Sequence, residues 1–291
     1  MLLATLGAIA FSGKAIIVKL AYRYGVDAVT LIMYRMLFAL PIFALMAWWA
    51  TYRQGDGGKA ALTRKDWLGV LGLGFCGYYL SSFLDFAGLQ YVTASLERLI
   101  LYLNPTLVLL LGWIFYRKKI ALIQVAAMAI SYAGVMLVFS HEIKLQGADV
   151  ALGALLVFAS AVSYAFYLVY SGELVQRLGA SRLVGLATMV ACLCCILQFL
   201  VLRPLSAALV APEVIWLSVL NATLCTAVPV LMVMMAVERI GAALAAQAGM
   251  VGPMSTILMG VLILGEPFNA WIVVGTALVM SGVFLVSKYR D

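Results

Sequence analysis

One apolar stretch limits what this chain can fold into. Residues 99–116 carry no charged side chain, and with their flanks they are long enough to cross a bilayer as a helix. With its flanks the span covers residues 92–116, so Glu97 and Arg98 lie about five residues inside its start. At a rise of about 1.5 Å per residue, they would be roughly 8 Å below one membrane surface. Because a charge in mid-bilayer costs about 2.5–3.5 kcal/mol, we expect this helix to border a polar cavity.

Similar apolar runs fill the rest of the chain. The 291 residues are 66% hydrophobic and 11% charged, whereas soluble domains average about 45–50% apolar and about 25% charged residues. The sequence therefore predicts an all-α polytopic membrane protein embedded in a lipid bilayer, with ten transmembrane helices. The expected spans are residues 2–21, 28–50, 67–89, 92–116, 120–140, 150–171, 183–203, 214–237, 241–264 and 268–287.

The basic residues predict an orientation for these spans. Of the nineteen Lys and Arg residues, twelve fall at one end of the spans, three at the other and four within them. Because cytoplasmic loops carry the excess of Lys and Arg, we expect both termini in the cytoplasm and the chain in the cell inner membrane. This topology also accounts for the net charge of +7, so no nucleic-acid partner is implied.

The second half of the sequence repeats the first. The segment that begins at Trp67 matches the one that begins at Trp216, and the segment at Gly134 matches the one at Gly282. Each half would hold five spans, so the second half would enter the membrane inverted. Inverted repeats are typical of carriers that work by alternating access. The predicted repeats are residues 1–147 and 148–291.

Charged residues within the spans point to a polar cavity. All of them belong to the first repeat and to the outer half of the membrane. Lys19 and Asp85 lie near span ends, where side chains also reach the interface, and the others would equally suit structural ion pairs. With Lys19 set aside, pairing leaves one cation over, which the carboxylate of a substrate would fit. The intramembrane charged residues are Lys14, Lys19, Arg35, Asp85, Glu97 and Arg98.

Polar and aromatic side chains share helix faces in several spans. Tyr78 and Ser82 are four residues apart in span 3, and Ser163 is next to Tyr164 in span 6. Such residues contact a small ligand or join helices to each other, and both interpretations stay open. The predicted substrate-binding residues are Lys14, Tyr78, Ser82, Glu97, Arg98, Tyr102, Ser163, Tyr164 and Gln247.

Two prolines occupy equivalent positions in the two repeats. Pro105 lies in the middle of span 4 and Pro253 in the middle of span 9. Proline removes a backbone hydrogen bond and kinks a helix, so the pair predicts gating kinks, with tolerated kinks as the alternative.

The sequence gives no sign of a cofactor, a metal site or an enzyme. The five cysteines lie in apolar runs without His or carboxylate neighbours. Gly72–Gly77 has the spacing of a dinucleotide fingerprint but lies inside a span, where no strand precedes it, and close helix packing explains its glycines better. A serine protease would need a His within the membrane, but the only histidine is His141 in a loop.

The combined pattern resembles the EamA-type carriers of the drug/metabolite transporter superfamily. The resemblance rests on ten spans in two repeats, on Asn104-Pro105, and on Gly265-Glu266-Pro267 at the end of span 9. In the first repeat Tyr116-Arg117 stands where the family has Gly-Glu. The resemblance implies export of a small metabolite, and the cavity aromatics favour the branch that exports aromatic and other neutral amino acids. A drug or cation exporter of the same fold and a channel or scramblase are the alternatives, and monomer and homodimer both stay open.

Overall fold

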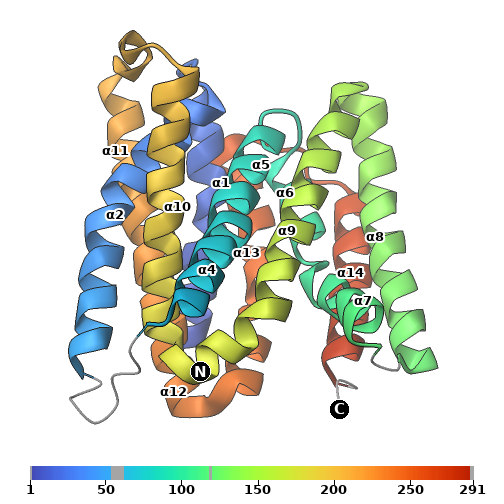
Figure 1. The fold of residues 1–291 in the computed structure, drawn as a ribbon. Coiled ribbons are helices and arrows are strands. Elements are labelled where there is room, and N and C mark those ends of the chain that lie inside the picture. The colour runs from blue at the N-terminus through green and yellow to red at the C-terminus, as the bar shows by residue number, and fades with distance from the viewer. Residues whose placement is uncertain (1, 54–61, 118–119, 289–291) are drawn as a thin grey trace.

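A computed structural model describes residues 2–53, 62–117 and 120–288, without the side chains of 234, 237, 238 and 241–248. Four of the basic residues used for orientation, Lys59, Lys118, Lys119 and Arg290, lie outside these ranges. Every regular element within them is a helix (Figure 1). The elements are α1 (Leu2–Tyr22), α2 (Ala28–Arg53), α4 (Arg64–Leu73), η1 (Gly74–Leu80), α5 (Ser81–Gly88), α6 (Ala94–Leu101), α7 (Asn104–Tyr116), α8 (Leu122–Gln146), α9 (Asp149–Leu178), α10 (Ala180–Leu202), η2 (Leu205–Ala208), α11 (Pro212–Ala222), η3 (Thr223–Ala227), α12 (Val228–Gly249), α13 (Val251–Met259), η4 (Gly260–Leu264) and α14 (Ala270–Lys288).

These helices form the ten predicted spans. In the described part of the chain, nine helical stretches are long and apolar enough to cross a membrane, and Val251–Leu264 is a shorter apolar one. Some predicted boundaries are wrong, most clearly between spans 8 and 9: we expected span 8 to end at residue 237 and span 9 to begin at 241, but α12 continues to Gly249 and α13 begins at Val251. Charged residues such as Arg239 do not interrupt a helix, so the break falls later, at Met250, two residues before Gly252-Pro253.

The two repeats pack as an inverted pair. Helix α2 packs against α10 and α8 packs against α14, so two helices contact their own equivalents in the other repeat. The first helix of each repeat packs into the opposite repeat, α1 against α12 and α9 against α5. The Leu2 end of α1 and the Lys288 end of α14 lie at the same end of the bundle, the lower end in Figure 1. We call the opposite end the outer end.

The backbone repeats as well as the sequence. Short π-helices, η1 and η3, occur at equivalent places in the two halves. The last turn of the span also ends alike, because Arg117 has φ +50° and Gly265 has φ +73°. This match corrects our alignment by one residue, since Arg117 and not Tyr116 stands opposite Gly265. The conformation is kept in the first repeat without the glycine that favours it.

Glycines allow α8 and α14 to approach closely. A Cβ atom at Gly134 would lie 2.6 Å from the carbonyl oxygen of Gly275. One at Gly282, its repeat equivalent, would overlap the Ser131 side chain and the Ala127 carbonyl. Close backbone approach through small residues is how helices associate in lipid, where burial of apolar surface gives no advantage. The matched glycines Gly134 and Gly282 therefore lie at the contact between the repeats that α8 and α14 form.

We predict that Gly282→Ala destabilises the protein, because the added methyl overpacks the α8–α14 contact at a cost of about 1–3 kcal/mol. The matched control is Gly172→Ala in α9, where a Cβ atom would meet nothing within 4 Å. Alanine is favoured over glycine in a helix by about 1 kcal/mol, so the control should unfold at the same temperature or higher. Thermal unfolding in detergent measures both, and equal stability of the two variants would contradict the packing argument.

Candidate functional site

A cavity of about 330 Å³ lies between the two repeats. The first repeat supplies side chains from α1, α2, η1, α5, α6 and the start of α7, and the second from α9, α10, η3 and α12. Ligand pockets typically measure about 300–1,000 Å³, so the space suits a small metabolite. Its polar lining residues are Lys14, Arg35, Tyr78, Ser81, Ser82, Asp85, Arg98, Tyr102, Asn104, Ser160, Tyr164, Thr188 and Thr226.

Lys14 forms the centre of a buried ionic cluster at this cavity. Its Nζ lies 2.5 Å from Asp85 Oδ2 and 3.3 Å from Glu97 Oε1. The exposed fraction of the side chain is 13% for Lys14, 3% for Asp85 and 1% for Glu97. Asp85 is therefore buried inside the protein and does not reach the membrane interface. The ammonium of Lys14 forms ion pairs with both carboxylates.

Two guanidinium groups are left without a carboxylate, where pairing had predicted one spare cation. Arg35 Nε donates to Thr226 Oγ1 at 3.2 Å, and its Cζ lies 5.1 Å from the centre of the Phe86 ring. Arg98 Nη2 donates to Ser12 Oγ at 3.4 Å. Within the described residues neither forms an ion pair, and both line the cavity. The cavity therefore attracts anionic groups.

Aromatic rings form one wall of the cavity. Tyr78 OH donates to Tyr167 OH at 3.2 Å, with the ring centroids 5.0 Å apart. Tyr164 stacks on Tyr167 at 5.5 Å. The rings come this close to η1 because residue 77 is glycine: a Cβ there would lie 2.5 Å from Tyr167. Gly74 likewise lies against the Ala187 carbonyl, so two glycines of the 72–77 motif serve helix packing, whereas Gly72 contacts nothing.

The structure brings most of the predicted binding residues together. Lys14, Tyr78, Ser82, Arg98, Tyr102 and Tyr164 all line the cavity. Glu97 lies behind Lys14 and is not among the lining residues. Ser163 donates to the Cys76 carbonyl at 2.7 Å, a contact that joins α9 to η1. Gln247 belongs to α12, but its side chain lies outside the described ones.

The spans that hold Pro105 and Pro253 are broken helices. Pro105 lies in the first turn of α7, directly after the break at residues 102–103, and Pro253 lies in the first turn of α13 after the break at Met250. Each proline thus lies in the first turn of a helix. Backbone N–H groups there have no hydrogen-bond partner within the helix, so the missing N–H of proline costs nothing. Tyr102 OH donates to the Gly249 carbonyl at 2.7 Å, so one hydrogen bond joins the two breaks.

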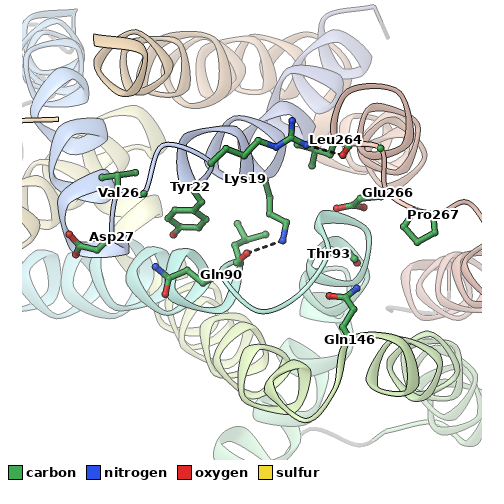
Figure 2. A pocket seen from close by; sticks show the side chains of 14 residues that line it. Lys19, Tyr22, Val26, Asp27, Gln90, Thr93, Gln146, Leu264, Glu266 and Pro267 are labelled. Carbon is green, nitrogen blue, oxygen red and sulfur yellow. Dashed lines mark hydrogen bonds between the residues drawn. The ribbon is translucent and has the colours of Figure 1, made fainter. Parts of the chain in front are cut away.

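A second pocket, of about 720 Å³, opens at the outer end (Figure 2). Lys19 points into it and donates to the carbonyls of Leu89 and Val92. Asp27 lies at its rim and accepts hydrogen bonds from Thr30 and Arg203. Burial raises the pKa of Asp27, but these hydrogen bonds outweigh burial and lower it below its usual value.

Two buried carboxylates bind the start of α6 beside this pocket. Glu266 accepts from Ala94 N at 2.7 Å and from Ser95 Oγ at 2.7 Å. Glu142 accepts from Thr93 N at 3.4 Å and also from the Thr93 hydroxyl. Anionic groups are stabilised by the free N–H groups of a helix start. Glu266 of the second repeat therefore binds the start of α6 in the first repeat at the outer end.

Several of these residues are not found by sequence reasoning. Asp85 and Arg35 stood out as charges within spans that point to a cavity, but they were not among the predicted substrate-binding residues. Thr226 gave no signal in the sequence, because its role depends on η3, in which its hydroxyl donates to the Asn221 carbonyl five residues earlier. The prediction that His141 lies in a loop is wrong: the predicted span ended at 140, whereas α8 continues to Gln146 and holds both His141 and Glu142.

Comparison with known proteins agrees with this architecture. The model of the EamA-like transporter family matches residues 1–140 and 151–288. The uncharacterized transporter YcbK of Bacillus subtilis (strain 168) is 31% identical over 292 residues, which cover 97% of this chain and 89% of that protein. A solved crystal structure of a protein shares the fold with a TM-score of 0.64 at 17% identity, over 98% of this chain and 94% of the other.

The class of protein follows from these matches and the fold. A ten-span bundle of two inverted repeats with a polar cavity between them is a membrane transporter. The chain belongs to the EamA-like transporter family, as the family model and the relative show.

We predict that Lys14→Met lowers stability by about 3–5 kcal/mol, because it leaves two carboxylates buried without a cation. The triple variant Lys14→Met, Asp85→Asn, Glu97→Gln removes the whole cluster and should recover most of the lost stability. Yield and thermal unfolding in detergent measure both. A single variant as stable as the original protein would show that the cluster does not need its cation.

Proposed function

We propose that this transporter exports neutral amino acids, aromatic ones among them, across the inner membrane by alternating access. The observation that carries the proposal is the pair of guanidinium groups, Arg35 and Arg98, which line the cavity without a carboxylate partner among the described residues. A substrate carboxylate is the group that fits them, because a guanidinium binds carboxylates through paired, charge-assisted hydrogen bonds.

The remaining lining suits the rest of an amino acid. Asp85 Oδ1 has no hydrogen-bond donor in the described part of the chain, and Asp85 lines the cavity, so it is placed to accept the α-ammonium. The rings of Tyr78 and Tyr164 offer an apolar wall with hydroxyl groups, against which an aromatic or aliphatic side chain packs.

The alternatives fit the cavity less well. An exporter of organic cations needs net negative charge at its site, but two arginines face this one. A channel or scramblase needs a continuous path, whereas Glu266 and Tyr102 join the two repeats on either side of the cavity. The excess of basic residues at the end that carries both termini supports a cytoplasmic location for that end.

We predict that Arg98→Gln weakens phenylalanine binding roughly 10- to 100-fold, because a hydrogen bond to a charged group contributes about 1.5–3 kcal/mol. The control is Lys144→Gln, which removes the same charge from an exposed position at the outer end. Counterflow of labelled phenylalanine, leucine and tetraphenylphosphonium into proteoliposomes measures transport. Counterflow of the phosphonium alone would favour the cation exporter, and leak without counterflow would favour a channel.

Gating is proposed to act at the two broken helices. Breaks in transporter helices near the membrane midplane are where half-helices move relative to each other. Pro105 and Pro253 keep each break from closing into a continuous helix, since proline cannot donate the hydrogen bond that would join the halves. Because the repeats are inverted, the break at Pro105 would serve one gate and the break at Pro253 the opposite one.

We predict that Pro105→Ala and Pro253→Ala shift the conformational equilibrium in opposite directions. Each alanine allows its two half-helices to join, and about 1.4 kcal/mol changes the population ratio tenfold. The reporter is Ser82→Cys in a background without the five native cysteines, labelled from outside by an impermeant thiol reagent. One proline variant should label faster than the parent and the other more slowly; equal shifts in one direction would contradict the inverted gates.

A further inference from the structure

The carboxyl groups of Asp85 and Glu97 share one contacting cation, the ammonium of Lys14. Both groups are buried, and Lys14 is the cation between them. Asp85 Oδ1 and Glu97 Oε2 accept no hydrogen bond from any described donor. Buried carboxylate oxygens are nearly always hydrogen-bonded, so two bare ones in a single cluster indicate a missing ligand. Lys14 contacts one oxygen of each group, so the two carboxyl groups are neighbours, and neither has a donor for the other when both are ionised.

Only a few other ionisable groups surround this pair. Lys14 and Tyr22 face it from α1, and Arg35 acts on Asp85 from α2. Arg98 acts on Glu97 from α6, the helix of Glu97 itself, and Cys225 of η3 lies near Lys14. Both guanidiniums face the substrate cavity and carry hydrogen bonds to hydroxyl groups, so Lys14 alone contacts the carboxylates directly.

We propose that the Asp85–Glu97 pair is a proton-binding site, and that substrate and proton occupy it alternately. A proton on Glu97 would donate to Asp85 and satisfy the bare oxygens of both. Lys14 would then balance the single remaining carboxylate. Two carboxylates that share a buried site repel each other, which favours protonation of one of them. Arg35 and Arg98 hydrogen-bond hydroxyl groups instead of these carboxylates, so they leave the two acids on one contacting ammonium.

The substrate supplies a second cation in contact with the pair, and this part of the inference rests on the proposed function. The α-ammonium of an amino acid at Asp85 would bring a second cation to the cluster. Two cations balance two carboxylates, so the proton leaves Glu97 for water in the cavity. One proton is released for each amino acid bound, and the reverse occurs when the amino acid dissociates. A carrier built in this way exchanges protons for amino acids.

Two measurements on the full-length protein in detergent test the site. The first is infrared difference spectroscopy without amino acid, in which the carbonyl band of a protonated carboxyl group should disappear as the pH rises. Glu97→Gln should lack this band, because its amide imitates the protonated acid and cannot titrate. The comparison is made in a Glu142→Gln background, so that this second buried carboxyl group adds no band of its own. The matched control in that background is Glu173→Gln, which removes an exposed carboxyl group and should keep the band.

The second measurement follows protons during binding. A pH-sensitive dye in weakly buffered solution should report about one proton released per bound phenylalanine, as linkage requires, and none for Glu97→Gln. In proteoliposomes, each unit of pH gradient should concentrate phenylalanine about tenfold in the original protein, and the gradient should have no effect on Glu97→Gln.

The outcomes separate the two proposals. If phenylalanine and leucine do not bind at all, the proposed function fails, and the infrared band alone decides the proton site. If phenylalanine binds without releasing protons, or if Glu97→Gln leaves the infrared band unchanged, the proton site is wrong while the transport proposal stands.

Discussion

The arrangement of this protein depends on the ammonium of Lys14 between two buried carboxylates. In the membrane interior such charges are tolerated only when they compensate each other, and here the three groups come from three separate helices, α1, α5 and α6. Their attraction brings these helices together on one side of the cavity. It also uses Lys14 for both acids, which leaves Arg35 and Arg98 to give the cavity its positive character.

Irregular backbone occurs in this protein where the repeats meet. A lipid-exposed backbone must satisfy its own hydrogen bonds, so breaks are found where protein groups replace the lost partners. The breaks of α6–α7 and α12–α13 are joined by Tyr102 and Gly249. The π-helices η1 and η3 present carbonyl and hydroxyl groups to Ser163 and Arg35. The same irregularities that shape the cavity are thus held by contacts between the two repeats.

The two ends of the first repeat are fastened differently. At the outer end Glu266 crosses from the second repeat to bind the start of α6. In the first repeat Arg117 keeps the left-handed turn that Gly265 makes in the second, but the next residue is Lys118 and not an acid. The inverted repeats therefore share this backbone turn without sharing the carboxylate contact that Glu266 makes. The charged residues that line the cavity, Lys14, Arg35, Asp85 and Arg98, all come from the first repeat, so similar helices form a cavity with asymmetric charge.

The sequence by itself determined the spans, the repeats and the polar residues that had to avoid lipid. These follow from helix length, charge and hydrophobicity, which are properties of short segments, and most candidates, such as Arg98 and Tyr78, do line the cavity. Only the tertiary structure decided which charges meet. Glu97 and Arg98 are adjacent in sequence, yet one lies behind Lys14 and the other faces the cavity, because successive helical residues point about 100° apart. Asp85 and Thr226 joined the site through packing between helices far apart in the chain, which no local pattern encodes.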